Sequence, residues 1–409
     1  MSETKSKKSH PVSADVLPLR AKASRFHESR TLKSLGMYLF FREISSDQDT
    51  AVTIDGRRLL MFGSNCYLGL TNHPEVKKAS IDAVERYGTG CSGSRFLNGS
   101  LDIHRLLEEE LAELVGFPRA VLFSTGYQAN LGAISAIVDR SEYVITDRMD
   151  HASIIDGCRL SFGRKLKFIH NDMEDLERVL RGLEPEVGKL VVVDGVYSME
   201  GDIAPLPAIA KLCERYRASL MVDDAHGIGV MGQCGAGTVN HFGIEKKVHI
   251  IMGTFSKSLA SLGGFLAADE DTIEYLKHRS RSLMFSASMP PANVEAVRAA
   301  LRIMKREPER VAQLWENTRR MREGLRAIGY DTGLSETPII PVRVGESLTA
   351  FKMCAELDKA EVFVNPVVAP AVPEGDCIIR LSLMATHTAE QIDTALDKIE
   401  RIGRSLHVV

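Results

Sequence analysis

The stretch LVVVDGVYSMEGDIAPLPAIAKLCERYRASLMVDDAHG, from Leu190 to Gly227, contains two short apolar runs on either side of an amphipathic segment. The first run, 190–193, has no polar residue, which is typical of a strand covered on both faces of a sheet. The segment 206–216 has the apolar spacing of a helix, and the second run follows at 219–222. A strand, a helix and a second strand in this order predict a parallel β-α-β unit.

The same alternation extends from about residue 55 to residue 295. Further apolar runs at 120–123 and 143–146 each precede a helical pattern. Repeated β-α-β units predict an α/β fold with a mostly parallel, doubly wound sheet. We therefore expect a large domain over residues 61–295, which holds any ligand that the sheet binds.

The pattern changes after a long helical region at 292–328. It continues with a strand, a helix, a strand and a helix, at 337–344, 348–360, 377–384 and from Ala389. This order predicts a smaller α+β domain over residues 296–409. The polar and mildly basic start of the chain predicts an N-terminal arm and entry segment over residues 1–60.

Composition limits the classes of function. The 409 residues carry a formal charge of -3, without the basic excess typical of proteins that bind nucleic acid or anionic membranes. Seven scattered cysteines without a C-x-x-C pair favour neither a disulfide framework nor a zinc site. Apolar runs fall short of the roughly 18 residues of a membrane span, and the opening MSETKSKKSHPVSADV is too polar for a secretory signal. We expect a cytoplasmic protein that binds small molecules or another protein chain, without a metal, nucleic acid or integral membrane segment.

Polar residues follow several of the predicted strands, at the edge where open α/β sheets bind their ligands. These residues are STGY at 124–127, DG at 194–195, DDAH at 223–226 and GTFSK at 253–257. Gly126 and Tyr127 open a helix, and N–H groups at a helix start suit a phosphate. An ordinary strand-to-helix turn would have the same sequence. Thr254 and Ser256 could add hydroxyl donors to such a phosphate.

Five titratable side chains are candidates for chemistry, and each has a structural alternative. Lys257 is either a surface residue of a turn or a reactive amine held in a site. Asp223, at a strand end, needs a cationic partner that a structural ion pair could also supply. His151 and His226 could be hydrogen-bonded loop residues or catalysts. Arg380, inside an apolar strand, needs an anion from the protein or from a substrate. Together these are the parts of a pyridoxal-phosphate site.

Motifs along nearly the whole chain beyond the arm resemble those of the α-oxoamine synthases. These fold-type-I pyridoxal-phosphate enzymes join an amino acid to an acyl-CoA with loss of carbon dioxide. The motifs are NCYLGL at 65–70, GCSGSRFLNGS at 90–100, STGYQAN at 124–130, DHASIIDG at 150–157, DGVYSMEGDIAPL at 194–206, VDDAHGIGVMG at 222–232, GTFSKS at 253–258, SASMPP at 286–291 and IIRLSLMATHT at 378–388. The resemblance implies a fold-type-I transferase with pyridoxal 5′-phosphate as cofactor.

The resemblance also implies a role for each matched residue. Lys257 resembles the lysine that binds the cofactor covalently and then removes the Cα proton of the substrate. Asp223 resembles the acid that keeps the pyridine nitrogen protonated, and His151 is similar to the histidine that stacks on the ring. His226 and Ser198 match residues near the phenolic oxygen of the cofactor.

The remaining matches concern the phosphate and the substrate. The positions that match the phosphate cradle are Gly126, Tyr127, Thr254 and Ser256. Ser286 matches a phosphate ligand given by the partner subunit, which implies a homodimer with shared active sites. Arg380 resembles the arginine that holds the substrate carboxylate, and Asn65 is expected beside it.

Within the family, GTFSKS and the entry YLFFREI at 38–44 are similar to the bacterial branch that condenses L-serine with palmitoyl-CoA, the first step of sphingolipid synthesis. That branch is the expected function, with L-serine and a long-chain acyl-CoA as substrates. The biotin-pathway and aminoketobutyrate branches more typically carry GTLGKA, and such a sister synthase is the first alternative. A non-catalytic regulatory subunit is the second alternative, which the joint presence of Lys257, Asp223 and His226 argues against.

One departure from the branch is visible beside the predicted acid. Where the serine-using branch often reads VDEAHS, this chain has VDDAHG, with Asp224 and Gly227 in place of glutamate and serine. These positions flank the Asp223 and His226 pair, so the cofactor prediction stands. The choice of amino acid is left open by this departure.

Overall fold

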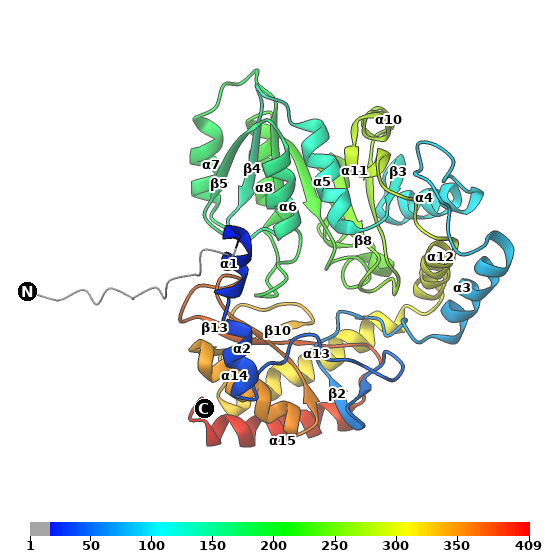
Figure 1. Ribbon diagram of the computed structural model, residues 1–409. Coiled ribbons are helices and arrows are strands. Elements are labelled where there is room, and N and C mark those ends of the chain that lie inside the picture. The colour runs from blue at the N-terminus through cyan, green and yellow to red at the C-terminus, as the bar shows by residue number, and fades with distance from the viewer. Residues whose placement is uncertain (1–16) are drawn as a thin grey trace, which may run out of the picture.

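The alternating segments form a seven-stranded sheet in the upper body of the molecule (Figure 1), in the computed structural model that describes residues 17–409. In spatial order the strands are β3 (Arg119–Phe123), β9 (Gly264–Ala268), β8 (Ile250–Thr254), β7 (Ser219–Asp223), β6 (Lys189–Asp194), β4 (Tyr143–Asp147) and β5 (Arg164–Phe168). The apolar runs predicted as strands at 120–123, 143–146, 190–193 and 219–222 all lie in this sheet. The opening polar segment, for which no secretory signal is expected, lies outside the described residues.

Most neighbouring strands of the sheet are parallel, as predicted. The pairs β8–β7, β7–β6, β6–β4 and β4–β5 run in the same direction. Strand β9 is antiparallel to both of its neighbours, β3 and β8. Only residues 255–263 connect β8 to β9, and a return of that length has no room for the helix that a parallel crossover needs.

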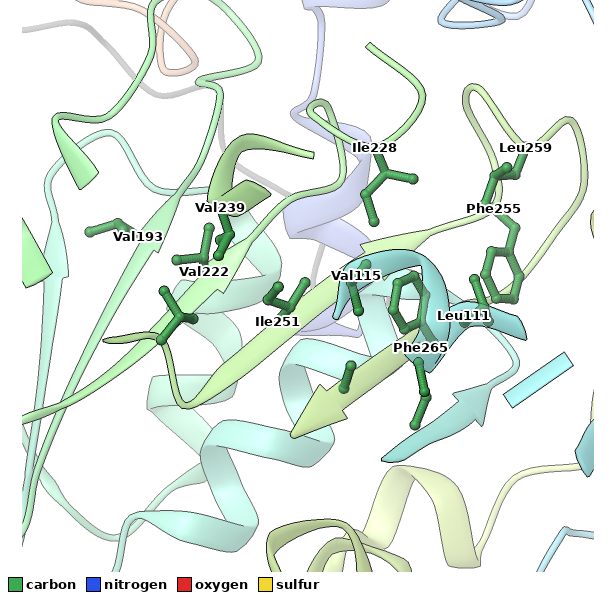
Figure 2. Packing of buried hydrophobic residues seen from close by; sticks show 14 of the residues in the cluster. Leu111, Val115, Val193, Val222, Ile228, Val239, Ile251, Phe255, Leu259 and Phe265 are labelled. Carbon is green, nitrogen blue, oxygen red and sulfur yellow. The ribbon is translucent and has the colours of Figure 1, made fainter. Parts of the chain in front are cut away.

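Helices cover both faces of the sheet because its strands are apolar on both sides. On β6, Leu190 and Val192 face one helical layer, and Val191 and Val193 face the other. The first layer contains α5 (Gly126–Ile137), α6 (Ala152–Leu160), α10 (Glu270–Arg279) and α11 (Arg281–Met284). The second contains α4 (Asp102–Val115), α7 (Met173–Arg181), α8 (Leu206–Arg215) and α12 (Pro291–Arg306), and α3 (Pro74–Tyr87) packs on α12. Figure 2 shows the core on this second side, around Val193, Val222 and Phe265.

The lower body of Figure 1 contains two small three-stranded sheets and three long helices. One sheet orders β10 (Ile339–Gly345), β13 (Cys377–Ser382) and β12 (Asn365–Val367), and the other orders β1 (Ala51–Ile54), β2 (Arg57–Met61) and β11 (Val362–Phe363). The helices are α13 (Glu309–Ile328), α14 (Ser347–Lys359) and α15 (Ala389–Ser405). The expected division into residues 1–60, 61–295 and 296–409 stays a prediction, and β2 and α12 run across its two boundaries.

The described part of the arm forms two short helices, α1 (Pro18–Ser24) and α2 (Glu28–Ser34). Most of their side chains are exposed. Short segments also form helical turns after β7, namely η1 (Gln233–Gly235), α9 (Thr238–His241) and η2 (Glu245–Lys247). Within residues 17–409, no helix combines the length and the apolar character that crossing a membrane requires.

Candidate active site

A cavity of about 250 Å³ lies at the carboxyl ends of β6, β7 and β8. Its wall contains every residue predicted for the site except Asn65, Ser286 and Arg380. The lining residues are Thr125, Gly126, Tyr127, His151, Ser153, Asp194, Ser198, Asp223, Ala225, His226, Met252, Thr254, Ser256, Lys257, Leu262 and Gly263. Parallel strands place their carboxyl ends at one edge of a sheet, and for this reason motifs spread over more than a hundred residues meet here.

Lys257 lies in the loop that follows β8 and is partly buried in the cavity wall. Desolvation lowers the pKa of Lys257 to about 8, although the nearby carboxylates of Asp223 and Asp194 favour the charged form. A lysine with this pKa has a neutral fraction near pH 7 and can act as a nucleophile or as a base. The structure therefore favours the reactive amine over the surface turn.

Asp223 is the last residue of β7 and is buried, with 3% of its surface exposed. Its Oδ2 accepts a hydrogen bond of 2.7 Å from Nδ2 of Asn130, and its Oδ1 accepts one of 3.0 Å from the backbone N–H of Ala225. Of the two cationic partners left open by the sequence, the structural ion pair is absent, because no lysine or arginine within residues 17–409 forms an ion pair with this carboxylate. Two neutral donors orient the carboxylate toward the cavity and leave its charge available to a ligand.

His151 caps the start of α6 and lies on the cavity wall. Its Nδ1 is 2.7 Å from Oγ of Ser153, and its backbone N–H donates to Oδ2 of Asp194 over 2.9 Å. Desolvation in the cavity lowers the pKa of His151. The ring is therefore neutral near pH 7 and presents an uncharged aromatic face.

His226 is buried in the loop after β7, and its Nδ1 lies 2.7 Å from the hydroxyl of Tyr67. Burial lowers the pKa of His226 well below its ordinary value, and the neighbouring cations Lys257 and Arg380 act in the same direction. Burial also raises the pKa of Tyr67 to about 12. Both groups are therefore uncharged at neutral pH, and the hydrogen bond fixes the orientation of the imidazole.

The predicted phosphate cradle is assembled at the start of α5. Gly126 and Tyr127 are the first residues of this helix, whose first N–H groups have no acceptor within the helix itself. Oγ1 of Thr254, at the end of β8, and Oγ of Ser256, in the loop that follows, lie 3.1 Å apart. A Cβ atom at Gly126 would lie 2.8 Å from the side chain of Thr254, so only glycine lets the helix approach this hydroxyl. Positive helix ends and paired hydroxyls form a suitable seat for an anion.

Arg380 projects from β13 of the lower body and is 7% exposed. Its Nε donates to the carbonyl of Ser198 over 2.6 Å, and its Nη1 donates to Oγ of Ser382 over 2.7 Å. Its Nη2 donates to Oδ1 of Asn65 over 3.0 Å. All three acceptors are neutral, and no carboxylate within residues 17–409 pairs with Arg380. The sequence left open whether the anion that pairs with Arg380 comes from the protein or from a substrate, and the structure favours a substrate anion.

Ser286 does not line the cavity of its own chain. It follows α11 and accepts a hydrogen bond of 3.1 Å from Nε2 of Gln128. Within a single chain, Ser286 therefore forms no hydrogen bond with another predicted site residue. Its expected role in the site of a partner subunit stays a prediction.

Sequence reasoning assigned no role to four residues that hold the site together: Tyr67, Asn130, Ser153 and Asp194. Asn130 donates to both Asp223 and Ser153, from α5 to β7 and α6. All four lie within the motifs NCYLGL, STGYQAN, DHASIIDG and DGVYSMEGDIAPL, but only their partners in space reveal a role. Asp194 carried a signal, because it follows an apolar run as Asp223 does.

The departure at Asp224 and Gly227 lies on the side away from the cavity. Asp224 is fully buried and its Oδ2 and Oδ1 accept from the backbone N–H and the hydroxyl of Thr238, over 2.7 and 2.8 Å. A Cβ atom at Gly227 would lie 1.9 Å from Oδ1 of Asp224. The two departures therefore fit each other, since this aspartate occupies the space that a serine side chain would need. Neither residue lines the cavity.

Two hollows on the described surface are more than twice as large as this cavity. One of about 570 Å³ lies between α4, η1 and α12. The other, of about 610 Å³, adjoins α3 and α12 and shares Ser256 and Leu262 with the cavity. Neither is lined by a histidine. Within residues 17–409, no cluster of histidine, cysteine and acidic side chains is placed to hold a metal ion. The 250 Å³ cavity is the candidate active site because it alone among these three combines an amine, buried acids and histidines.

The donor set of this cavity fits pyridoxal 5′-phosphate. Lys257 offers an amine for an aldehyde, and Asp223 offers a buried carboxylate without a protein cation for a ring nitrogen. The start of α5 with the hydroxyls of Thr254 and Ser256 offers a seat for a phosphate. His151 offers a neutral ring for an aromatic face.

Comparisons with known proteins agree with this geometry. Residues 57–399 match the family described as aminotransferase class I and II. The chain is 54% identical over 390 residues to a serine palmitoyltransferase of Sphingobacterium spiritivorum, covering 95% of this chain and 98% of the relative. It is 41% identical to an 8-amino-7-oxononanoate synthase of Thermoanaerobacter pseudethanolicus, covering 92% of this chain and 96% of the relative. The chain therefore belongs to the aminotransferase class I and II family and, within it, to the α-oxoamine synthases.

Solved structures narrow the comparison. A serine palmitoyltransferase from S. paucimobilis with bound PLP–myriocin aldimine superposes with a TM-score of 0.93 at 35% identity, covering 96% of this chain and 100% of that chain. An 8-amino-7-oxononanoate synthase from Francisella tularensis superposes with a TM-score of 0.74 at 26% identity, covering 85% of this chain and 99% of that chain. The fold prediction, a fold-type-I transferase with a mostly parallel sheet, is confirmed.

Proposed function

We propose that this chain condenses L-serine with palmitoyl-CoA to 3-oxosphinganine, with release of coenzyme A and carbon dioxide, the first step of sphingolipid synthesis. Similar relatives named serine palmitoyltransferase are 47 to 54% identical over nearly the full length. The observation that carries the proposal is the buried guanidinium of Arg380, which is held by neutral oxygens and has no carboxylate partner in the described chain. Such a cation is suited to the carboxylate of an amino acid.

Pyridoxal 5′-phosphate is the cofactor of the enzyme, and when bound it supplies an electron-withdrawing ring that stabilises negative charge on the Cα atom of the amino acid. Lys257 binds the cofactor through its amine. The same Nζ takes and returns a proton at Cα, since its pKa of about 8 lets it hold or release a proton near neutral pH. Asp223 keeps the ring nitrogen protonated, and His151 orients the ring.

Arg380 and Asn65 orient the substrate carboxylate, which is lost as carbon dioxide. Tyr67 links this pair to the cofactor side, because its hydroxyl lies 3.4 Å from Oδ1 of Asn65 and 2.7 Å from Nδ1 of His226. His226 and Ser198, which both line the cavity, would bind the phenolic oxygen of the cofactor. A single hydrogen-bonded chain thus runs from the carboxylate seat to the cofactor seat, so that binding of the substrate orients both.

The enzyme acts as a homodimer with shared sites, in the cytoplasm. Ser286 supports this assembly, since it matches a phosphate ligand of the family and yet lies outside the cavity of its own chain. Analytical ultracentrifugation tests the dimer. Mixing a Lys257→Ala chain with a Ser286→Ala chain tests the sharing. If Ser286 serves the site of the partner, each mixed dimer has one site with both residues intact and one site with both replaced, so the mixture should be more active than either variant alone.

Product mass analysis with a panel of amino acids and acyl thioesters tests the function. We expect serine to be preferred over alanine and glycine, and activity to rise with chain length toward palmitoyl. Each buried methylene contributes about 0.8 kcal/mol, so two carbons improve kcat/KM by roughly tenfold until the acyl site is full. A maximum at an acetyl or pimeloyl thioester would replace this function by that of a sister synthase.

A further inference from the structure

His170 lies outside the cavity and contacts two loops that form its rim. Its Nδ1 is 3.0 Å from Oδ1 of Asp147, and its Nε2 is 2.9 Å from Oδ2 of Asp202. The edge of its ring packs on Tyr197, with centroids 4.4 Å apart and planes at 90°. Neither His170 nor these three partners line the cavity. The contacts nevertheless join the segments after β4, β5 and β6.

The first of these contacts leads to His151. Asp147 begins the turn 147–151, and Oδ1 of Asp147 also accepts from the N–H of Met149 over 2.8 Å. Asp150 accepts from the N–H of Asp147 over 2.9 Å and from that of Asp194 over 3.1 Å. Asp194 in turn accepts from the N–H of His151 over 2.9 Å. The turn is therefore tied by carboxylates from its first residue to its last.

The second contact leads to Ser198. The backbone carbonyl of Asp202 accepts from the N–H of Tyr197 over 3.0 Å, which closes the segment 197–202. The carbonyl of Ser198, in the same segment, accepts from Nε of Arg380 over 2.6 Å. A displacement of Asp202 would therefore move an acceptor of the arginine that binds the substrate carboxylate.

His170 is the cation of this buried acidic group. Asp147, Asp150, Asp194 and Asp202 are all buried, and no lysine or arginine within residues 17–409 pairs with any of them. Burial opposes a charge on His170, but hydrogen bonds with Asp147 and Asp202 raise the pKa of His170 to about 10. Both ring nitrogens are then protonated near pH 7, and each donates to one carboxylate. A neutral side chain at this position would not balance the negative charge of Asp147 and Asp202.

We propose that His170 is a positioning residue that fixes the turn 147–151 and the segment 197–202 relative to each other, and thereby sets His151 and Ser198 in the site. The effect on cofactor and substrate rests on the function proposed above. The effect on the two segments does not, because it follows from contacts within the chain.

Three variants of the full-length, cofactor-loaded protein test the proposal by hydrogen exchange and mass spectrometry. His170→Gln should speed exchange about tenfold in both segments, a change of about 1.4 kcal/mol in the free energy of local opening. Asp202→Asn should speed exchange in 197–202 and leave 147–151 unchanged. His278→Gln, on the exposed surface of α10, is the matched control and should change neither. Helix α15 of the lower body, which makes no hydrogen bond in the described chain with His170 or with either segment, should keep its wild-type exchange in all three.

A second readout follows the site itself. The visible circular dichroism of bound pyridoxal 5′-phosphate should change in His170→Gln, because the orientation of His151 against the cofactor ring changes. The dissociation constant of pyridoxal 5′-phosphate should rise about tenfold. Both should stay at wild-type values in His278→Gln. General destabilisation would speed exchange in α15 as well, and that outcome would overturn the positioning role.

Exchange in both segments of His170→Gln equal to that of the control would also overturn the proposal. If His170→Gln does not fold, Asp202→Asn decides, and unchanged exchange in 197–202 would reject the role. Failure of the wild-type chain to bind pyridoxal 5′-phosphate would reject the proposed function, and the exchange data would still decide the role of His170.

Discussion

Nη2 of Arg380 donates to Oδ1 of Asn65 over 3.0 Å, across 315 positions of the chain. Arg380 comes from β13 of the lower body, and Asn65 follows β2. The carbonyl of Ser198, from the upper body, completes the contact. The carboxylate seat is therefore built by three segments that meet only in the folded chain, between the two bodies of Figure 1.

Replacing Arg380 by alanine should strongly raise the KM for serine. A charge-assisted contact with a carboxylate is worth on the order of 1.5 to 3 kcal/mol, which corresponds to roughly a 10- to 150-fold rise in KM. Titration of the cofactor absorption spectrum with serine measures the change directly. Arg320→Ala, at an exposed arginine of α13 that pairs with Asp393, is the matched control and should leave this KM unchanged. Unaltered serine affinity in Arg380→Ala would assign the residue to structure alone.

Asp223→Asn should fold and lose most of its turnover. The amide oxygen can still accept from Ala225, but the side chain no longer carries the charge that keeps a ring nitrogen protonated. We expect a loss of at least about a hundredfold in kcat. Asp224→Asn, at the neighbouring carboxyl that faces Thr238 instead of the cavity, should retain turnover within a few-fold. Steady-state kinetics on both variants check this, and comparable losses would place the effect in folding.

Tyr67→Phe should lower both stability and turnover. It removes the hydroxyl that lies 2.7 Å from Nδ1 of buried His226, and an unpaired buried nitrogen costs about 1 to 3 kcal/mol. Tyr330→Phe removes a comparable buried bond, of 2.9 Å to the carbonyl of Ile399, in the lower body. Thermal unfolding should show similar destabilisation of both variants. Only Tyr67→Phe should reduce kcat. Equal kcat values of Tyr67→Phe and Tyr330→Phe would show that His226 has no role in the site.

Lys257→Met should stabilise the cofactor-free protein at pH 7. Burial lowers the pKa of Lys257 from 10.5 to about 8, so the folded state binds fewer protons than the unfolded state between these values. The stability of the wild-type chain therefore rises as the pH increases from 8 to 10.5, and the full penalty for the buried charge applies below pH 8.

Methionine removes this penalty, on the order of 2 kcal/mol after allowance for partial exposure of the side chain. Urea unfolding at several pH values measures it. The difference between Lys257→Met and wild type should shrink from pH 8 to 10.5, and a difference independent of pH would show that Lys257 has an ordinary pKa. Turnover of Lys257→Met should be absent at every pH.

Much of the upper body could be predicted from local patterns. The apolar runs 190–193 and 219–222 predict buried strands because helices cover both faces of such a strand. The apolar spacing of the helix between them is visible in a short window of sequence. The rule that parallel strands end at one edge then placed Asp223, Thr254 and Lys257 together. The antiparallel return of β9 was not predicted, because it depends on the short connection at 255–263.

The sequence by itself determined which residue types lie at the sheet edge, and the resemblance of its motifs supplied their roles. Only the tertiary structure decided what each side chain pairs with. It placed the neutral amide of Asn130 against Asp223, left Arg380 without a protein carboxylate, and paired His170 with Asp147 and Asp202. Hydrogen bonds and charges act over a few ångströms in space, whereas these partners lie tens to hundreds of residues apart, so no local pattern records them.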